Sequence, residues 1–287
     1  MTRRTEPKPE KTDLRPVRSQ PSWLPRKTDE AVDTLVNRAW REARVGATAS
    51  SEKIAMSISR DIVRQIGDGR LTAGSPLPSE AEMAAMYSVG RTSVREALRL
   101  LEVQGLISIR TGPGGGPTVM EPTTADAGRM LSLHMNVRSC TFGDLAQARL
   151  EIDPILAGLA AENATANGIE RLRDIVGIME EIPMGRNAEW ARTASMFNAI
   201  IAALAGNSVL ALLSSALRAI YAERISSINY TAKMRKSAIL QYNHIIEAVV
   251  ENDCLKARKS SFDLINNSLK QMYKHHPDIL TSTVDWK

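Results

Sequence analysis

The fold of the N-terminal half is decided by residues 77–120, which read LPSEAEMAAMYSVGRTSVREALRLLEVQGLISIRTGPGGGPTVM. Ser79 is followed three residues later by Glu82, and this pair is typical of a capping box, in which each side chain satisfies a free amide at a helix start. The sequence therefore predicts a short helix after Ser79. We expect it to end in the turn 87–90, where Gly90 would supply a backbone conformation that other residues resist.

A second helix is predicted from Arg91, because Val94, Leu98 and Leu101 recur at helical spacing and would face inward. Off that apolar stripe lie Arg91, Thr92, Ser93, Arg95 and Arg99. Gly105 is expected to end the helix. Residues 106–109 and 117–119 then predict two strands around a glycine-rich turn. This order predicts a winged helix-turn-helix, whose second helix places cationic and hydroxyl side chains in the DNA major groove.

A glycine-rich loop can also bind the phosphates of a nucleotide. Such loops lead into a helix and usually carry Lys followed by Ser or Thr after the glycines. Here Pro117, Thr118 and Val119 follow the glycines instead. The pattern favours a wing over a nucleotide site.

These motifs resemble the DNA-binding domain of the bacterial GntR family over residues 51–121. The matching positions are Ile62, Gly69, Leu71, Gly74, Leu77, Pro78, Ser79, Glu80, Val89, Arg91, Val94, Arg95, Glu96, Ala97, Leu98, Leu101, Gly105, Leu106 and the glycine-rich wing. The resemblance implies DNA contacts from Arg91, Thr92, Ser93 and Arg95, and from Thr111 and Gly112 in the wing. Two positions depart from the family pattern: Ala81 replaces a charged residue, and Gly90 replaces Ser or Thr. The resemblance therefore does not specify an operator sequence.

Charge is distributed unevenly along the 287 residues. The net charge is +5, but residues 1–46 hold 11 Lys and Arg against 7 Asp and Glu, whereas residues 47–121 hold 8 of each. The DNA-binding interpretation of residues 47–121 therefore depends on the local cluster of Arg91, Arg95, Arg99 and Arg110. Residues 1–46 are expected to form a largely disordered basic tail with a possible short helix over 29–44, able to add salt-sensitive attraction to DNA.

The C-terminal half is predicted to be an all-α antiparallel bundle over residues 122–276, followed by a tail at 277–287. Hydrophobic residues make up 43% of the chain but aromatic residues only 4%, which favours aliphatic helix packing. Asp153-Pro154 predicts a kink or a break in one helix. Residues 199–217 carry no charge and are long enough to span a bilayer. Gly206, Asn207 and Ser208 interrupt them, which favours two buried helices instead.

This half resembles the FadR-type ligand-sensing domain, the FCD domain, over residues 125–272. The matching positions are Leu145, Arg149, Leu150, Glu151, Leu159, Ala160, Ala161, Gly206, Asn207, Leu210, His244, Ile246, Ala248, Val249, Asp253 and Ala257. The resemblance implies a helical bundle around a ligand cavity, where many members hold a divalent metal through an Asp-x3-His pair and two further histidines. Those positions fall here on Ala194, Asn198, His244 and Leu264. The metal site is therefore predicted to be lost, and no cofactor is expected.

Three residues are candidates for effector binding: Arg149, Asn198 and His244. Arg149 could anchor a carboxylate or phosphate, or it could form an ion pair within the bundle. His244 could line the cavity beside Asn198, or it could be a hydrogen-bonded core residue. The residues alone leave both pairs of alternatives open.

The sequence as a whole predicts a DNA-binding transcriptional regulator. We expect a cytoplasmic homodimer, with a repressor favoured by the resemblance, that binds a palindromic operator and responds to an organic acid, a sugar acid or an acyl thioester. The unpaired cysteines, Cys140 and Cys254, suit a reducing compartment. No Ser-His-Asp or Cys-His arrangement suggests an enzyme. The alternatives are a helical ligand-binding protein and a membrane-attached regulator with only non-specific DNA affinity.

Overall fold

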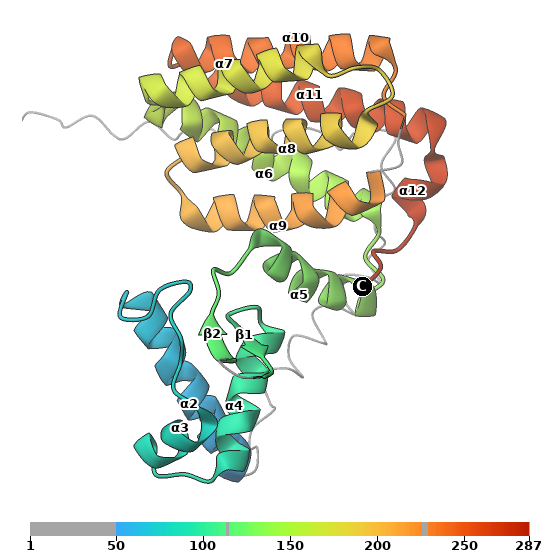
Figure 1. Cartoon of the computed structure of the whole chain (residues 1–287). Helices are drawn as coiled ribbons and strands as arrows, with labels where there is room; N and C mark the ends of the chain where they lie inside the picture. Colours follow the sequence, from blue (N-terminus) through green and yellow to red (C-terminus); the bar gives the residue numbers. More distant parts are fainter. Residues whose placement is uncertain (1–49, 113–114, 226–228, 287) are drawn as a thin grey trace, which may run out of the picture. The chain divides into compact units, whose positions relative to one another are not determined.

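A computed structural model of the chain describes residues 50–112, 115–225 and 229–286 (Figure 1). The basic tail at 1–46 and the possible helix at 29–44 lie outside the described residues.

The N-terminal region is a winged helix-turn-helix, as predicted. It comprises α2 (Ser50–Gly67), α3 (Glu80–Met86), α4 (Arg91–Val103), β1 (Ile107–Arg110) and β2 (Gly116–Val119). The two strands pair antiparallel, with Ile107 opposite Val119, and Pro76 adds a bridge to Thr118. The helices close over a core of Ala55, Ile58, Ile62, Leu77, Met83, Val94, Ala97, Leu98, Leu101, Ile107 and Val119. The apolar stripe predicted for the second helix is therefore its buried face.

Local hydrogen bonds fix where α3 and α4 begin and end. The Ser79 amide donates to Glu82 Oε2 at 2.8 Å and the Glu82 amide donates to Ser79 Oγ at 3.3 Å, which confirms the capping box. Gly105 has a φ of +74°, as expected for the residue that ends a helix. The prediction for Gly90 was wrong, because its φ is −71°. The left-handed residue of the turn is Ser88, with a φ of +53°.

The C-terminal region contains only helices in its described part, apart from one isolated bridge. They are α5 (Thr124–Val137), α6 (Phe142–Asn163), α7 (Ala166–Glu181), α8 (Asn187–Leu204), α9 (Ser208–Ile225), α10 (Ala232–Val250), α11 (Cys254–His275) and α12 (Pro277–Thr281). α6 is the central helix, in contact with α8, α9, α10 and α11, and α5 packs along α9 (Figure 1). The bundle predicted from the sequence is thus confirmed.

Two interruptions predicted in the bundle have different outcomes. α6 continues through Pro154, so a break at this position is wrong, and the kink stays a prediction. The uncharged stretch 199–217 does divide into α8 and α9, because Gly206 has a φ of +69° and Asn207 Oδ1 accepts from the Leu210 amide at 3.0 Å. In the described part of the chain, no helix is both long enough and apolar enough to cross a bilayer.

The segment expected to be a C-terminal tail packs against the bundle. Leu280 and Val284 are 4% and 0% exposed, and the Val284 amide donates to the Cys140 carbonyl at 2.8 Å. Thr283 forms a β-bridge with Thr141, the residue that caps α6. The helical domain therefore extends beyond residue 276.

Candidate nucleic-acid interface and ligand cavity

The start of α4 presents polar groups to solvent. Arg91 and Thr92 are exposed and Ser93 is half-buried. The N-cap residue, Gly90, has no side chain to hydrogen-bond the first amides of the helix. Free amides and the positive end of the helix dipole attract anions. This end of α4 is therefore suited to a DNA phosphate as well as to base contacts.

Arg95 and Arg99 continue this polar face along α4. Arg91, Arg95 and Arg99 are spaced four residues apart, so they share one side of the helix, and all three are exposed. Arg95 donates to both carboxylate oxygens of Glu80, from Nε at 3.2 Å and from Nη2 at 2.8 Å. This hydrogen bonding lowers the pKa of Glu80. The Arg95 side chain is still 70% exposed, so DNA could take the place of Glu80.

The wing residues Thr111 and Gly112 follow β1 directly, and both are exposed. Gly112 has a φ of +108°, which other residues rarely adopt. The Ile109 amide donates to Glu102 Oε1 at 3.1 Å, which ties β1 to α4. The domain thus holds the base of the wing in a fixed position relative to α4.

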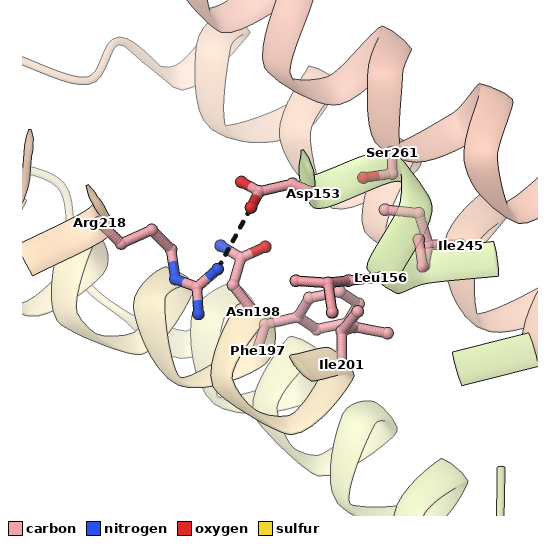
Figure 2. Close-up of a pocket in the computed structure, with 9 residues that line it drawn as sticks. Asp153, Leu156, Phe197, Asn198, Ile201, Arg218, Ile245 and Ser261 are labelled. Atoms are coloured by element: carbon pink, nitrogen blue, oxygen red, sulfur yellow. Dashed lines mark hydrogen bonds and ion pairs between the residues drawn. The ribbon is translucent and has the colours of Figure 1, made fainter. Parts of the chain in front are cut away.

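The helical domain contains a small cavity between α6, α8, α9, α10 and α11 (Figure 2). Its volume is about 10 Å³, which is room for about one water molecule. The lining residues are Asp153, Leu156, Ala157, Phe197, Asn198, Ile201, Arg218, Ile245 and Ser261. Asp153, Asn198 and Arg218 lie together on one side of this set, and Leu156, Ile201 and Ile245 lie on the other side with the hydroxyl of Ser261 (Figure 2).

A buried ionic cluster forms the polar end. Asp153 Oδ2 accepts from Arg149 Nε at 3.2 Å and from Arg149 Nη2 at 3.1 Å, while Asp153 Oδ1 lies 3.4 Å from Arg218 Nη1. The hydroxyl of Ser214 donates to the same Oδ1. The side chains of Arg149, Asp153 and Arg218 are only 12%, 5% and 7% exposed. The guanidinium of Arg149 also lies over the ring of Tyr221, 5.0 Å from its centre.

Burial shifts the titration of groups around this cluster. It lowers the pKa of Arg218 to about 10, although the carboxylate of Asp153 acts in the opposite direction. Arg218 therefore stays positively charged at neutral pH. Burial also raises the pKa of Tyr221 and of Tyr242, so both phenols stay neutral.

One of the three effector-site candidates, Asn198, lines the cavity. Its Nδ2 donates to the Ala194 carbonyl at 3.0 Å. Arg149 does not line the cavity, but it donates a hydrogen bond to Asp153, which does line it. His244 is half-buried on α10, next to Ile245, and is also not a lining residue.

Sequence reasoning missed two polar groups of the cavity, Asp153 and Arg218. Asp153 lies four residues after Arg149, a helical ion-pair spacing, but it was considered only for its effect on the helix with Pro154. Arg218 is the first charged residue after the uncharged stretch 199–217. A single charged residue directly after a long uncharged stretch was the sequence pattern that could have predicted a buried, functional Arg218.

The residues at the family metal positions do not fit a divalent metal. Ala194 and Leu264 have no donor atom, and Asn198 and His244 alone are too few ligands. The described residues contain no group of three or more His, Cys, Asp and Glu that could hold a metal ion.

The comparisons with known proteins agree with this architecture. Residues 54–115 match the family described as bacterial regulatory proteins, gntR family, and residues 144–267 match the FCD domain. The transcriptional repressor NanR of Cronobacter sakazakii is 29% identical over 172 residues, which cover 58% of this chain and 64% of NanR. The transcriptional regulator Mce2R of Mycobacterium tuberculosis is 28% identical over 221 residues, 75% of this chain and 88% of Mce2R.

One solved structure supports the fold. The GntR protein of Streptococcus agalactiae superposes with a TM-score of 0.61 at 21% sequence identity, over 77% of this chain and 99% of that protein. This likeness supports the fold alone, and the expected pairing of a gntR-type domain with an FCD domain rests on the two family matches. This chain carries a gntR-family helix-turn-helix domain followed by an FCD domain.

Proposed function

We propose that this protein is a transcriptional repressor of the FadR subfamily, which binds a specific operator and releases it when a small molecule occupies the helical domain. The observation that carries the proposal is the exposed polar face of α4 in a gntR-type domain, joined in one chain to an FCD domain with an internal cavity. NanR, one of its relatives, is named a repressor. The protein would act on DNA in the cytoplasm and not as an enzyme.

In this proposal the DNA contacts come from α4 and the wing. Arg91 and Arg95 would donate to base edges in the major groove, and Thr92 and Ser93 would bond to bases or phosphates. Three further residues would contact the backbone of the operator, namely Arg99, Thr111 and Gly112. A homodimer would place two copies of α4 on the half-sites of a palindrome.

The effector would bind at the cavity of the helical domain. Asn198 would contact it directly, and Arg149 would act through its hydrogen bond to Asp153, which also lines the cavity. His244 is the third candidate contact, on α10, which contributes Ile245 to the lining. By this proposal the effector is an organic acid, a sugar acid or an acyl thioester, held without a metal ion.

The test is fluorescence anisotropy of the purified protein with DNA from upstream of its own gene, at two salt concentrations and with excess competitor DNA. We expect a complex of one dimer per operator that survives the competitor. Binding that disappears with salt on every DNA sequence tested would mean only phosphate attraction, and it would contradict the proposal.

A further inference from the structure

The last described residues, 277–286, form a strap across the corner between α5 and α6 (Figure 1). The Phe142 amide donates to the Ser282 carbonyl at 3.0 Å, and the Val284 amide donates to the Cys140 carbonyl at 2.8 Å. These backbone hydrogen bonds join the strap to the turn after α5 and to the first residue of α6.

Side-chain packing also holds the strap in place. Leu280 and Val284 are 4% and 0% exposed. A Cβ atom at Gly143 would lie 2.9 Å from the Leu280 carbonyl oxygen, so a larger residue at the start of α6 would push the strap away. The strap follows residues 144–267, which match the FCD domain, and α5 precedes them. Their contact therefore joins the two ends of the helical domain.

Apart from the strap, α5 is anchored by little buried apolar surface among the described residues. Its buried residues are Gly128 and Ser132, and its larger apolar side chains are half-buried or exposed. Hydrophobic stabilisation is roughly proportional to the apolar area removed from water, so the packing of α5 on α9 is close but weak. The last turn of α5 is tied to the strap, because Asn136 Nδ2 donates to the Val284 carbonyl at 2.9 Å.

A helix of this length depends on such anchors. α5 has 14 residues, and isolated helices of that length are marginal in water. Because helix formation is cooperative, loss of an anchor at one end increases opening along the whole helix. The strap is easier to release than the bundle is to unfold, since it orders a whole segment chiefly for the burial of Leu280 and Val284.

We propose that the strap is a latch, which holds α5 in place and so fixes the helix that leads from the wing into the bundle. α5 begins at Thr124, and residues 120–123 connect it to β2. When the strap is released, α5 opens and the DNA-binding domain gains freedom of movement. In a dimer this freedom weakens operator binding, because each DNA-binding domain has to be ordered again on its half-site. Only this last step rests on the proposed function.

The test is hydrogen–deuterium exchange mass spectrometry of the full-length protein. Val284→Asp places a charge at a fully buried position and should release the strap. The matched control, Trp286→Asp, adds the same charge to the same segment at a residue that is 58% exposed. We expect amides throughout α5, including residues 127–131, to exchange about 10-fold faster in Val284→Asp, and those of α7 and α10 to stay unchanged. Faster exchange confined to residues 138–143, or equal α5 exchange in the two variants, would overturn the proposal.

A second pair of variants breaks the contact from the side of α5 and decides the result if Val284→Asp unfolds the bundle. Asn136→Ala removes the hydrogen bond to the strap, and the control Val137→Ala changes the next residue of α5, which is 64% exposed. Exchange in α5 should be about 3-fold faster in Asn136→Ala than in Val137→Ala. Equal exchange in these two variants would also overturn the proposal.

Operator binding is measured by anisotropy on the same samples. We expect the affinity of Val284→Asp to be about 10-fold lower than that of Trp286→Asp. Faster α5 exchange in a protein that binds no specific operator would support the latch and refute the proposed function. Specific operator binding with unchanged α5 exchange in Val284→Asp would refute the latch and leave the proposed function standing. Faster α5 exchange with unchanged operator affinity would overturn the link from the strap to DNA binding.

Discussion

Asp153→Asn should strongly destabilise the helical domain. The change keeps the size of the side chain but removes the carboxylate that, among the described residues, pairs with the buried guanidiniums of Arg149 and Arg218. Breaking a buried ion pair by removing one partner typically costs about 3 to 5 kcal/mol. For a domain of this size each kcal/mol lowers the melting temperature by about 2 to 4 °C. We therefore expect a fall of about 6 to 20 °C, measured by circular dichroism without added ligand.

The control for this prediction is Asp263→Asn. Asp263 accepts from Lys259 on the surface of α11, and these side chains are 36% and 72% exposed. A surface pair contributes at most about 1 kcal/mol, so this variant should melt within about 4 °C of the wild type. If Asp153→Asn melted as close to the wild type as the control, the two guanidiniums would have to be solvated or neutralised by another group, and Asp153 would not be their essential counter-charge.

Three further outcomes are expected for the DNA-binding domain. Arg95→Ala should lower operator affinity about 5- to 150-fold by anisotropy, as expected for loss of a base contact. The control, Arg70→Ala, removes an exposed ion pair with Asp68 in the same domain and should leave the affinity unchanged. Equal affinities of the two variants would exclude Arg95 from the interface. Leu98→Ala should cost about 2 to 5 kcal/mol in urea unfolding, because Leu98 is 1% exposed, and a cost below about 1 kcal/mol would contradict its place in the core. Tyr87→Phe should cost about 1 kcal/mol at neutral pH, because it removes the 2.8 Å hydrogen bond that lowers the pKa of Asp61. The stabilisation from this hydrogen bond is fully present above the ordinary pKa of a carboxyl group, and it is lost as the pH falls through the lowered pKa of Asp61. The stabilities of wild type and variant should therefore converge in acid. A difference in stability that stays constant with pH would contradict the assignment of the effect to Asp61.

The winged domain was predictable because its signals are local. The capping box at Ser79 and Glu82, the apolar stripe of α4 and the glycine after it each act within a few residues, so spacing alone reveals them. The error at Gly90 has a physical origin. Glycine permits a left-handed backbone but does not require it, and here Ser88 takes that conformation while Gly90 serves as an N-cap.

The ionic cluster of the cavity was less predictable because its members are far apart in the sequence. Arg149 and Asp153 share α6, but Arg218 comes from α9, 65 residues after Asp153. Their meeting depends on how α9 packs against α6, which no local pattern records. The burial of Leu280 and Val284 was equally hard to predict. A short segment with few apolar residues has the sequence pattern of a solvated tail, and its burial depends on packing against helices that are distant in the sequence.

Arg218 lies on α9, the helix that packs along the first helix after the wing. α9 packs along α5, and the approach is close at Gly128, where a Cβ atom would lie 3.3 Å from the Ala216 carbonyl oxygen. A closely packed interface of this kind transmits a displacement and does not absorb it. α5 begins at Thr124, so only residues 120–123 separate it from β2 of the wing. Residues 120–123 and α5 are therefore the stretch of chain that joins the wing to the bundle, and α5 packs directly on α9, the helix that carries Arg218.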